Sequence, residues 1–385
     1  MDQVGSASCL GAAASLRAGL FGPVVPRPAA ALPSASTVPF RRVETAAIDL
    51  QEHGWAVVEG VLPQEVCDEY ITSLWDWIEG LGTGVDRNDP STWGSDRFPP
   101  TYRGILNTLE VGHQAFVWRI RSHPCLVKVF ESLWGTNELL TSFDAINMLG
   151  PHDEAPAPGW LHVDQAPYRP HLASIQGIMN MTQVGPDITG TLMVKDKSYK
   201  AHQDFFYKAS KLSEEQLNRI PDHYQFTPEQ LPYWDKFESV GLSGGVGSLF
   251  LWDSRTVHSN IAPAQLKQWR HVVYACYQPR SMASARDLGL KEKAWREHSI
   301  TTHLPAQDIR IYDAEFAKLY PNETKVMDSA GKGPAFKVTC DRQKVENSAV
   351  RRLAGVEPYP EAEIRTAKPL MQISVDALRA KLNEP

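Results

Sequence analysis

The chain of 385 residues lacks the features of a membrane protein, a disulfide scaffold and a nucleic-acid-binding protein. No apolar run approaches the ~20 residues that are needed to span a bilayer. The five cysteines are scattered and form no C-x-x-C pair, so a zinc ribbon or a disulfide framework is not expected and a reducing, intracellular compartment is favoured. The net charge of −6 provides no basic excess to hold a phosphate backbone. We therefore expect neither a nucleic-acid partner nor a membrane span.

Acidic residues are also missing from the N-terminal stretch between Gln3 and Val43. Arginines are present there among alanine, serine and proline, a composition that is typical of an organellar transit peptide. A disordered low-complexity tail has the same composition. Residues 1–42 are thus predicted to be one or the other. The compartment is expected to be the cytoplasm, or a mitochondrion or plastid if the segment is a transit peptide.

Short β-rich runs dominate the chain from about Leu139 onward. They read SFDAINML, WLHVD, ASIQGIMNMT, TGTLMV, GSLFLW and RHVVYACYQ, and glycine, proline and aspartate separate them. Helical patterns precede them, one after Pro63 and one over 114–134 that Pro124 should split. A segment at about 202–240 interrupts the strands, and its apolar residues predict helices that pack on the outside.

This pattern predicts a mainly β fold with flanking helices, in which the strands form a sandwich or barrel. One domain is expected over 43–300, with a helical lead-in and the inserted helical segment. Residues 301–385 contain several prolines and are predicted to be a helical and irregular C-terminal extension that packs on the core.

The stretch GWLHVDQ places His162 and Asp164 two residues apart in an apolar run. On a strand these side chains share a face, and burying both is costly unless something pairs or coordinates them. A ferrous ion takes two histidines and one carboxylate on one side and leaves the other positions open. His258, which follows the later run GSLFLW, would supply the second imidazole. The sequence therefore predicts a metal site at these three residues.

Two further features bear on this site. Arg270 opens the β-run after His258, and a buried guanidinium there suits a carboxylate because its planar fork binds both oxygens. A second His-x-Asp pair, His202 and Asp204, follows a lysine-rich turn and opens a helical pattern, in which positions i and i+2 do not share a face. Capping or surface exposure is expected to explain that pair better than metal binding.

The order GWLHVDQ … TGTLMVKDKSYKAH … GSLFLWDSRTVHSN … RHVVYACYQPR resembles the phytanoyl-CoA dioxygenase-like branch of the iron(II)/2-oxoglutarate-dependent oxygenases. The resemblance covers roughly 43–280. The stretch from Lys195 to Ser198 differs from the Pro-Gly-Ser-His sequence that is usual in the family. This difference affects the shape of a loop rather than the metal ligands. The resemblance implies a double-stranded β-helix core of the jelly-roll or cupin-like type.

By this resemblance His162, Asp164 and His258 are the ligands of Fe(2+), and no catalytic residue beyond them is expected. Dioxygen and 2-oxoglutarate would be consumed to oxidise a small molecule, with release of succinate and CO2. Halogenating relatives replace the carboxylate by a small residue, so Asp164 favours hydroxylation, desaturation or ring closure. The sequence identifies neither the substrate nor the oligomeric state.

The resemblance also implies residues that bind the cosubstrate. Arg270 is the expected partner of the distal carboxylate of 2-oxoglutarate. On the strand after the His-x-Asp pair, Asn180 is placed for one more contact and Gln176 is a second candidate. A buried amide that the backbone satisfies is the alternative interpretation of Asn180.

Two other functions stay open at this point. A cupin-like oxygenase or isomerase would use the metal without 2-oxoglutarate and would have no need of Arg270. In a non-catalytic barrel, His162 and Asp164 would form a buried hydrogen-bonded pair, which leaves His258 and Arg270 without a shared role.

Overall fold

Two β-sheets form the centre of the protein, in a computed structural model that describes residues 24–26, 40–94, 96–151, 160–262, 266, 268–312 and 336–383. The first sheet has the strand order β2 (Trp55–Val58), β11 (Leu249–Asp253), β7 (Ile175–Asn180), β13 (Arg270–Tyr274), β5 (Ile146–Leu149) and β3 (Ile105–Leu106), and β14 (Tyr277–Pro279) joins β4 (Leu139–Thr141) to β7. The second sheet has the order β1 (Val24–Pro26), β10 (Ser239–Gly241), β8 (Thr191–Lys195), β12 (His258–Ile261), β6 (His162–Val163) and β9 (Tyr224–Gln225).

Between β5 and β13 the chain crosses repeatedly from one sheet to the other. Strands β5, β7, β11 and β13 belong to the first sheet, whereas β6, β8, β10 and β12 belong to the second, and their pairings are all antiparallel. This winding is a jelly roll of the double-stranded β-helix type. The predicted fold is therefore confirmed.

Alternation along the strands decides which side chains enter the space between the sheets. Ile178 on β7 and Tyr274 on β13 pack there with apolar residues of the second sheet. Because strand side chains alternate with period two, Gln176 and Asn180 point the same way as Ile178, and Arg270 the same way as Tyr274. The three polar residues predicted to bind the cosubstrate thus face the interior of the roll.

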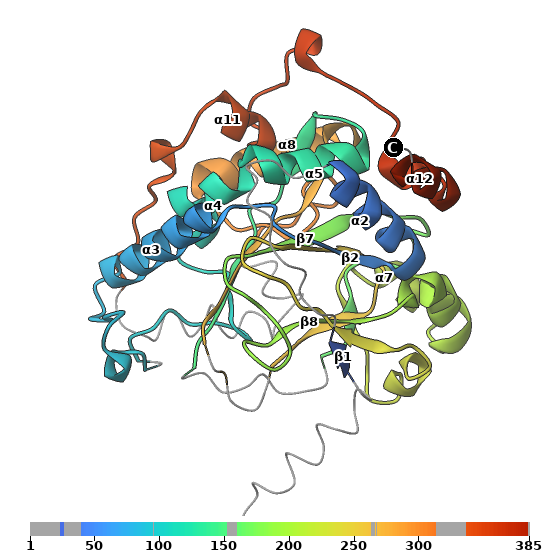
Figure 1. Cartoon of the computed structure of the whole chain (residues 1–385), viewed down its shortest axis with the longest axis horizontal. Coiled ribbons are helices and arrows are strands. Elements are labelled where there is room, and N and C mark those ends of the chain that lie inside the picture. Colours follow the sequence, from blue (N-terminus) through green and yellow to red (C-terminus); the bar gives the residue numbers. More distant parts are fainter. Residues whose placement is uncertain are drawn as a thin grey trace, which may run out of the picture.

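Helices cover the outer face of the first sheet (Figure 1). They are α2 (Phe40–His53), α3 (Gln64–Gly80), α4 (Ala115–Arg121) and α5 (Pro124–Trp134), accompanied by the 3-10 turns η1 (Pro90–Thr92) and η2 (Val111–His113). The predicted helical stretch 114–134 does divide at Pro124. The side chain of His123 accepts a hydrogen bond from the Cys125 amide, and Pro124 occupies the first turn, where no amide hydrogen is required.

The inserted segment covers the outer face of the second sheet. It consists of η3 (Ser198–Ala201), α6 (His202–Asp204), the π-helical η4 (Phe205–Ala209), α7 (Glu214–Arg219), β9 and η5 (Leu231–Trp234). Phe205, Phe206 and Trp234 pack there with Leu161 and Val163. The outside packing is thus as predicted, although the helix is α-helical only over His202–Asp204 and continues as the π-helical η4.

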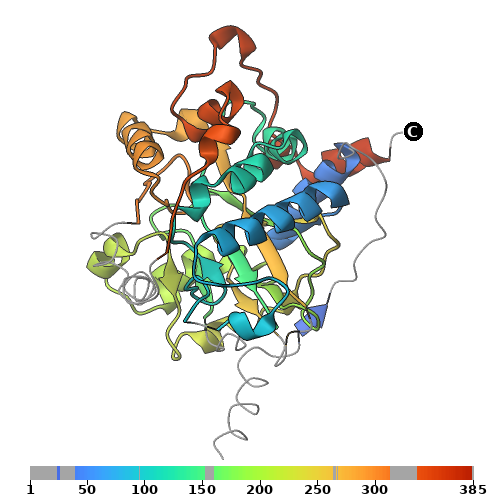
Figure 2. The same cartoon turned by 90° about the vertical axis from the view of Figure 1, so that its left-hand side faces the viewer.

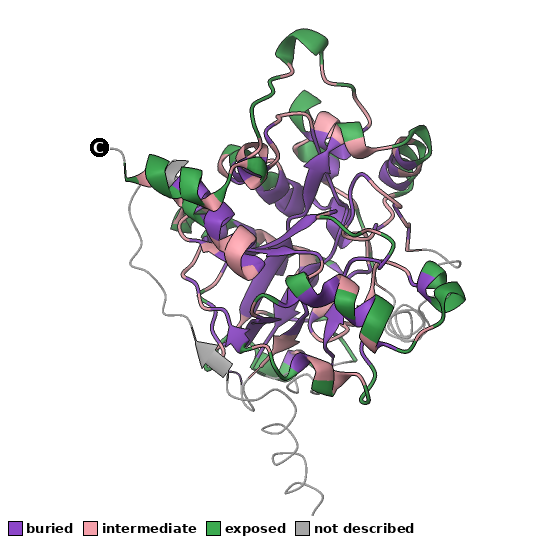
Figure 3. Ribbon diagram, turned by 90° about the vertical axis from the view of Figure 1, so that its right-hand side faces the viewer, coloured by how far each residue is buried: buried purple, intermediate pink, exposed green. Residues whose placement is uncertain are grey.

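The described part of the C-terminal segment returns to the helical side of the protein (Figure 2). It follows η6 (Arg280–Met282) and α8 (Ala285–Glu297), and it contains η7 (Arg342–Lys344), α11 (Ser348–Ala354), η8 (Glu361–Glu363), η9 (Leu370–Gln372) and α12 (Val375–Leu382). Helix α12 lies beside α2, where Arg379 pairs with Glu52 and Lys381 pairs with Glu44. Figure 3 shows that its outward face is exposed while the strands are buried.

The N-terminal segment contributes one strand. β1 runs parallel to β10, so three residues of the predicted tail or transit peptide pair with the second sheet. Residues 1–23 and 27–39 lie outside the described residues, and the interpretation of 1–42 stays a prediction. Among the described residues, no helix combines the length and the apolar character needed to cross a membrane.

Gly247 lies in the turn before β11, and its carbonyl accepts hydrogen bonds from the amides of Val61 and Leu62. Its φ is +73°, and an added Cβ would lie 2.0 Å from the carbonyl oxygen of Leu62. We expect Gly247→Ala to lower the free energy of unfolding by at least ~2 kcal/mol, because it adds left-handed strain to a clash with backbone. Gly80→Ala is the control, since no atom lies within 4 Å of its added methyl group. Denaturant unfolding compares the two, and equal stabilities would contradict the prediction.

Candidate metal centre

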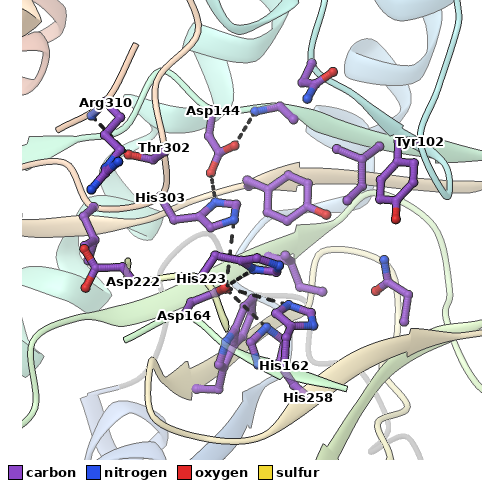
Figure 4. Close-up of a pocket in the computed structure, with 18 of the residues that line it drawn as sticks. Tyr102, Asp144, His162, Asp164, Asp222, His223, His258, Thr302, His303 and Arg310 are labelled. Atoms are coloured by element: carbon purple, nitrogen blue, oxygen red, sulfur yellow. Dashed lines mark hydrogen bonds and ion pairs between the residues drawn. The ribbon is translucent and has the colours of Figure 1, made fainter. Parts of the chain in front are cut away.

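The imidazoles of His162, His223 and His258 surround the carboxylate of Asp164 (Figure 4). The Nε2 atom of His162 lies 3.8 Å from Oδ1 of Asp164, and the Nε2 atom of His258 lies 3.3 Å from Oδ2. The Nδ1 atom of His223 lies 3.0 Å from Oδ1. The side chains of His162, Asp164 and His258 are at most 7% exposed. The structure thus brings together the three residues that the sequence predicted as ligands.

The two predicted histidines face each other across neighbouring strands. His162 on β6 and His258 on β12 are paired in register, and their ring centroids are 4.1 Å apart. Each ring donates its Nδ1 hydrogen to a carbonyl two residues earlier, at 2.9 Å to Trp160 and 2.8 Å to Thr256. A carbonyl can only accept, so the lone pair of each ring is on the Nε2 that faces Asp164. This is the tautomer that a metal ligand requires.

The charge state of the cluster also fits a metal site. Burial lowers the pKa of His162 well below its ordinary value, and the neighbouring imidazole of His258 lowers it further, so the ring is neutral at pH 7. Burial alone would raise the pKa of Asp164, but the imidazoles of His162, His223 and His258 hold it well below the usual range. An ionised carboxylate beside the neutral imidazole of His162 belongs to the donor set that binds a divalent transition metal.

His223 was not found from the sequence. It comes from the inserted segment, directly before β9, and has no carboxylate at strand spacing. His162, Asp164 and His223 also lie close enough together to share one ion. His258 is more deeply buried, faces His162 in register and is oriented through its Nδ1 hydrogen, and its role as the second imidazole ligand stays a prediction. His223, which is one-quarter exposed, then supports Asp164 from the side.

The amides on β7 make different contacts. Gln176 donates from Nε2 to Oδ2 of Asp164 at 3.0 Å, so it orients the carboxylate of the cluster. Asn180 donates from Nδ2 to the carbonyl and hydroxyl oxygens of Ser248, at 3.2 and 3.1 Å. The side-chain oxygens of both amides have no hydrogen-bond partner among the described residues. Cosubstrate binding by either residue stays a prediction.

Arg270 is a buried cation inside the roll. It is 3% exposed, and its Nη1 donates to the side-chain oxygen of Asn147 at 3.0 Å. Within the described ranges no carboxylate forms an ion pair with Arg270, and its Nε has no hydrogen-bond partner. Burial lowers the pKa of Arg270 to about 10, so the guanidinium is still charged at neutral pH. A buried charge of this kind is costly unless an anion binds to it.

The second His-x-Asp pair does not form a cluster. His202 is buried, its Nε2 is 2.9 Å from the carbonyl oxygen of Gln165, and its ring contacts Phe206. Asp204 is exposed and pairs with Lys208. The expectation of capping or exposure is therefore wrong for His202, because its side chain points inward, toward the chain that follows Asp164.

A cavity that is partly open to solvent adjoins the cluster. Its walls include the aromatic residues Tyr102, Trp160, Trp252, Tyr274 and Tyr312. The C-terminal segment contributes Thr302, His303, Leu304, Asp308, Arg310 and Tyr312. The sequence predicted only that this C-terminal segment packs on the core. The structure shows that its first part is a wall of the site.

A double-stranded β-helix with two imidazoles and a carboxylate between its sheets is the architecture of the non-haem iron oxygenases and their cupin-like relatives. Over 263 residues the chain is 31% identical to Ava biosynthesis cluster protein O of Aspergillus versicolor, a match that covers 67% of this chain and 84% of that protein. A match of 26% identity over 137 residues covers 31% of the chain and 36% of a Dictyostelium discoideum protein named "Putative phytanoyl-CoA dioxygenase". No family model matches the chain.

Among solved structures, the product of GlcNAc Inducible Gene 2 from Candida albicans aligns with a TM-score of 0.51 and 15% identity. The alignment covers 87% of this chain and 79% of that one and concerns the fold alone. The chain belongs to the same family as the Aspergillus protein. The match to the Dictyostelium protein agrees with the predicted resemblance to the phytanoyl-CoA dioxygenase-like oxygenases.

Proposed function

We propose that the protein is an iron(II)- and 2-oxoglutarate-dependent dioxygenase that hydroxylates, desaturates or cyclises a small molecule. The observation that carries the proposal is the combination of the cluster around Asp164 with Arg270 inside one jelly roll. The cluster has the donor set for Fe(2+), and Arg270 is a buried cation that needs an anion. A metal protein that does not bind 2-oxoglutarate would need the cluster but would have no role for Arg270.

Each residue then has a definite task. The Nε2 atoms of His162 and His258 and the carboxylate of Asp164 would hold the ion. Gln176 keeps that carboxylate oriented through its 3.0 Å hydrogen bond. Such outer contacts fix the ligands in the direction that the metal requires.

The cosubstrate would occupy the interior next to β13. Arg270, held by Asn147, offers its guanidinium to the distal carboxylate of 2-oxoglutarate. Asn180 is proposed as a second contact because it points into the same interior from β7. When bound, iron, 2-oxoglutarate and dioxygen supply the oxidising chemistry, in which the cosubstrate becomes succinate and CO2. The walls of the cavity position the substrate and exclude water.

Succinate release tests this proposal. The protein is reconstituted with iron(II) without oxygen and then given 2-oxoglutarate, air and one member of a metabolite panel at a time. We expect succinate release that depends on iron and rises with at least one member of the panel. The Asp164→Ala variant is the control and should release no succinate. Iron binding with no succinate above this control for any member would favour the cupin-like alternative.

A further inference from the structure

A second group of metal-ligating side chains lies away from the cavity. Glu110, His298 and Cys340 each offer one ligand atom, and these three atoms all lie within 4.8 Å of one another. The Nδ1 atom of His298 is 3.1 Å from Oε2 of Glu110. None of these residues lines the cavity beside Asp164. The group, which we call the Cys340 cluster, is therefore separate from the candidate iron site.

Three segments that are far apart in the chain supply the Cys340 cluster. Glu110 directly precedes η2, His298 directly follows α8, and Cys340 lies shortly before η7. Glu110 and His298 both have a φ of 54°, a left-handed conformation that is costly for residues with a side chain. The fold holds both residues in this conformation, in which the carboxylate and the imidazole meet.

The buried side chain of His113 supports the cluster. Its ring centroid is 5.6 Å from that of His298. Its Nδ1 accepts a hydrogen bond from Arg342 at 2.8 Å, and its Nε2 donates to the carbonyl of Ser299 at 2.9 Å. Because both ring nitrogens are used, His113 is a support and not a ligand. Ser299 follows His298, and Arg342 belongs to the same segment as Cys340, so these bonds join the two segments before any ion binds.

The donor set of the Cys340 cluster suits zinc. Thiolate and imidazole bind zinc well, whereas calcium and magnesium take oxygen ligands. Ligand atoms around a tetrahedral zinc ion lie roughly 3.3–3.7 Å apart, so an approach of about 1 Å is enough to close the site. The side chains of Glu110 and His298 are 37% and 33% exposed, so water can reach the fourth position of the ion.

The thiol of Cys340 has little to give up on binding an ion. Its sulfur donates to the carbonyl of His113 at 3.5 Å, which is a weak hydrogen bond. Burial raises the pKa of Cys340, and the amide and the guanidinium of Arg342 act in the opposite direction. Zinc would therefore displace the thiol proton and replace one weak hydrogen bond by a metal–sulfur bond.

We propose that Glu110, His298 and Cys340 form a zinc site that joins the C-terminal segment to the core. Residues 302–312, which contribute to the wall of the cavity, lie between His298 and Cys340 in the chain. An ion bound to both residues would close this stretch into a loop, and a metal that closes a long loop stabilises the folded state. The inference does not rest on the proposed function, because the cluster contains no ligand of the candidate iron site.

Cobalt(II) is the probe for this site. A cobalt ion bound to a thiolate has a charge-transfer absorption in the near ultraviolet, and the residues around Asp164 offer no sulfur ligand. The reduced, full-length protein is titrated with cobalt(II) without oxygen. We expect the thiolate band to appear, to disappear when zinc is added, and to be lost in Cys340→Ser. Cys125→Ser is the matched control and should keep the band, because Cys125 is also half-buried but belongs to no such cluster among the described residues.

The two other ligands are tested with the thiol in place. Glu110→Gln and His298→Gln should each weaken the cobalt binding that produces the band by at least about tenfold. His162→Ala lacks a ligand of the candidate iron site and should keep the band, so failure of the iron site leaves this signal unaffected. Zinc should also raise the midpoint of thermal unfolding of His162→Ala, and adding Cys340→Ser should remove this gain.

The inference about the Cys340 cluster is wrong if the parent protein shows no thiolate band. A band that survives Cys340→Ser would also overturn it, as would affinities for cobalt that are unchanged in both Glu110→Gln and His298→Gln. If Cys340→Ser does not fold, Cys340→Ala takes its place in the comparison.

Discussion

Arg270→Ala is expected to weaken 2-oxoglutarate binding to the iron-loaded protein by about 30- to 150-fold while iron binding is retained. Losing a hydrogen bond to a charged group costs ~2–3 kcal/mol, at ~1.4 kcal/mol per decade of affinity. Inside the roll the guanidinium has Asn147 as a neutral partner and no carboxylate ion pair in the described parts of the chain. Arg270→Lys keeps the charge but loses the fork, so its affinity should fall between those of the parent and Arg270→Ala.

Calorimetric titration under anaerobic conditions gives the dissociation constants. Arg280→Ala is the control, because Arg280 follows the last strand and pairs with Glu138 away from the site. If Arg270→Ala binds 2-oxoglutarate as tightly as the parent protein does, the reason for assigning 2-oxoglutarate as cosubstrate is lost. The cupin-like alternative would then explain the cluster better.

The second large effect concerns the ligands themselves. His162→Ala or His258→Ala should abolish stoichiometric iron binding and turnover with the fold preserved. His223→Ala removes a neighbour of Asp164 and should weaken iron binding by about 10- to 100-fold, as loss of outer contacts does. His202→Ala is the control within the same inserted segment.

Thermal unfolding with and without iron(II) provides an independent reading. Iron at one hundred times its dissociation constant should stabilise the parent by about 2.7 kcal/mol, and this gain should vanish in His258→Ala. If His223→Ala loses the ion and His258→Ala keeps it, the ligand set is His162, Asp164 and His223 instead.

Local patterns in the sequence predicted a mainly β fold and placed His162 beside Asp164, whereas the double-stranded β-helix was implied by the family resemblance. Period-two alternation predicts that Arg270 shares a face with Tyr274. Asn180 and Gln176 were instead expected from the family resemblance, and alternation on β7 turns both toward the interior of the roll. His162 and Asp164 are neighbours in the chain, and their closeness needs no long-range contact. Strand β6 covers only His162–Val163, yet the two side chains still meet.

The residues that the sequence did not reveal are brought in by distant segments. Asp144 and His303 are hydrogen-bonded but 159 positions apart, and no periodicity connects them. His223 depends on how the insertion folds back onto β6. Asp164 lies just beyond the end of β6, where strand alternation no longer determines the direction of its side chain. The hydrogen bond between Gln176 and Asp164 could therefore not be predicted from alternation.

The central claim is that one jelly roll holds both the ion and 2-oxoglutarate. Anaerobic calorimetric titration of the parent protein with 2-oxoglutarate, with and without iron(II), tests it most directly. The account predicts one saturable site per chain in the iron-loaded protein and much weaker binding without the metal. Stoichiometric iron binding with no binding of 2-oxoglutarate would contradict it.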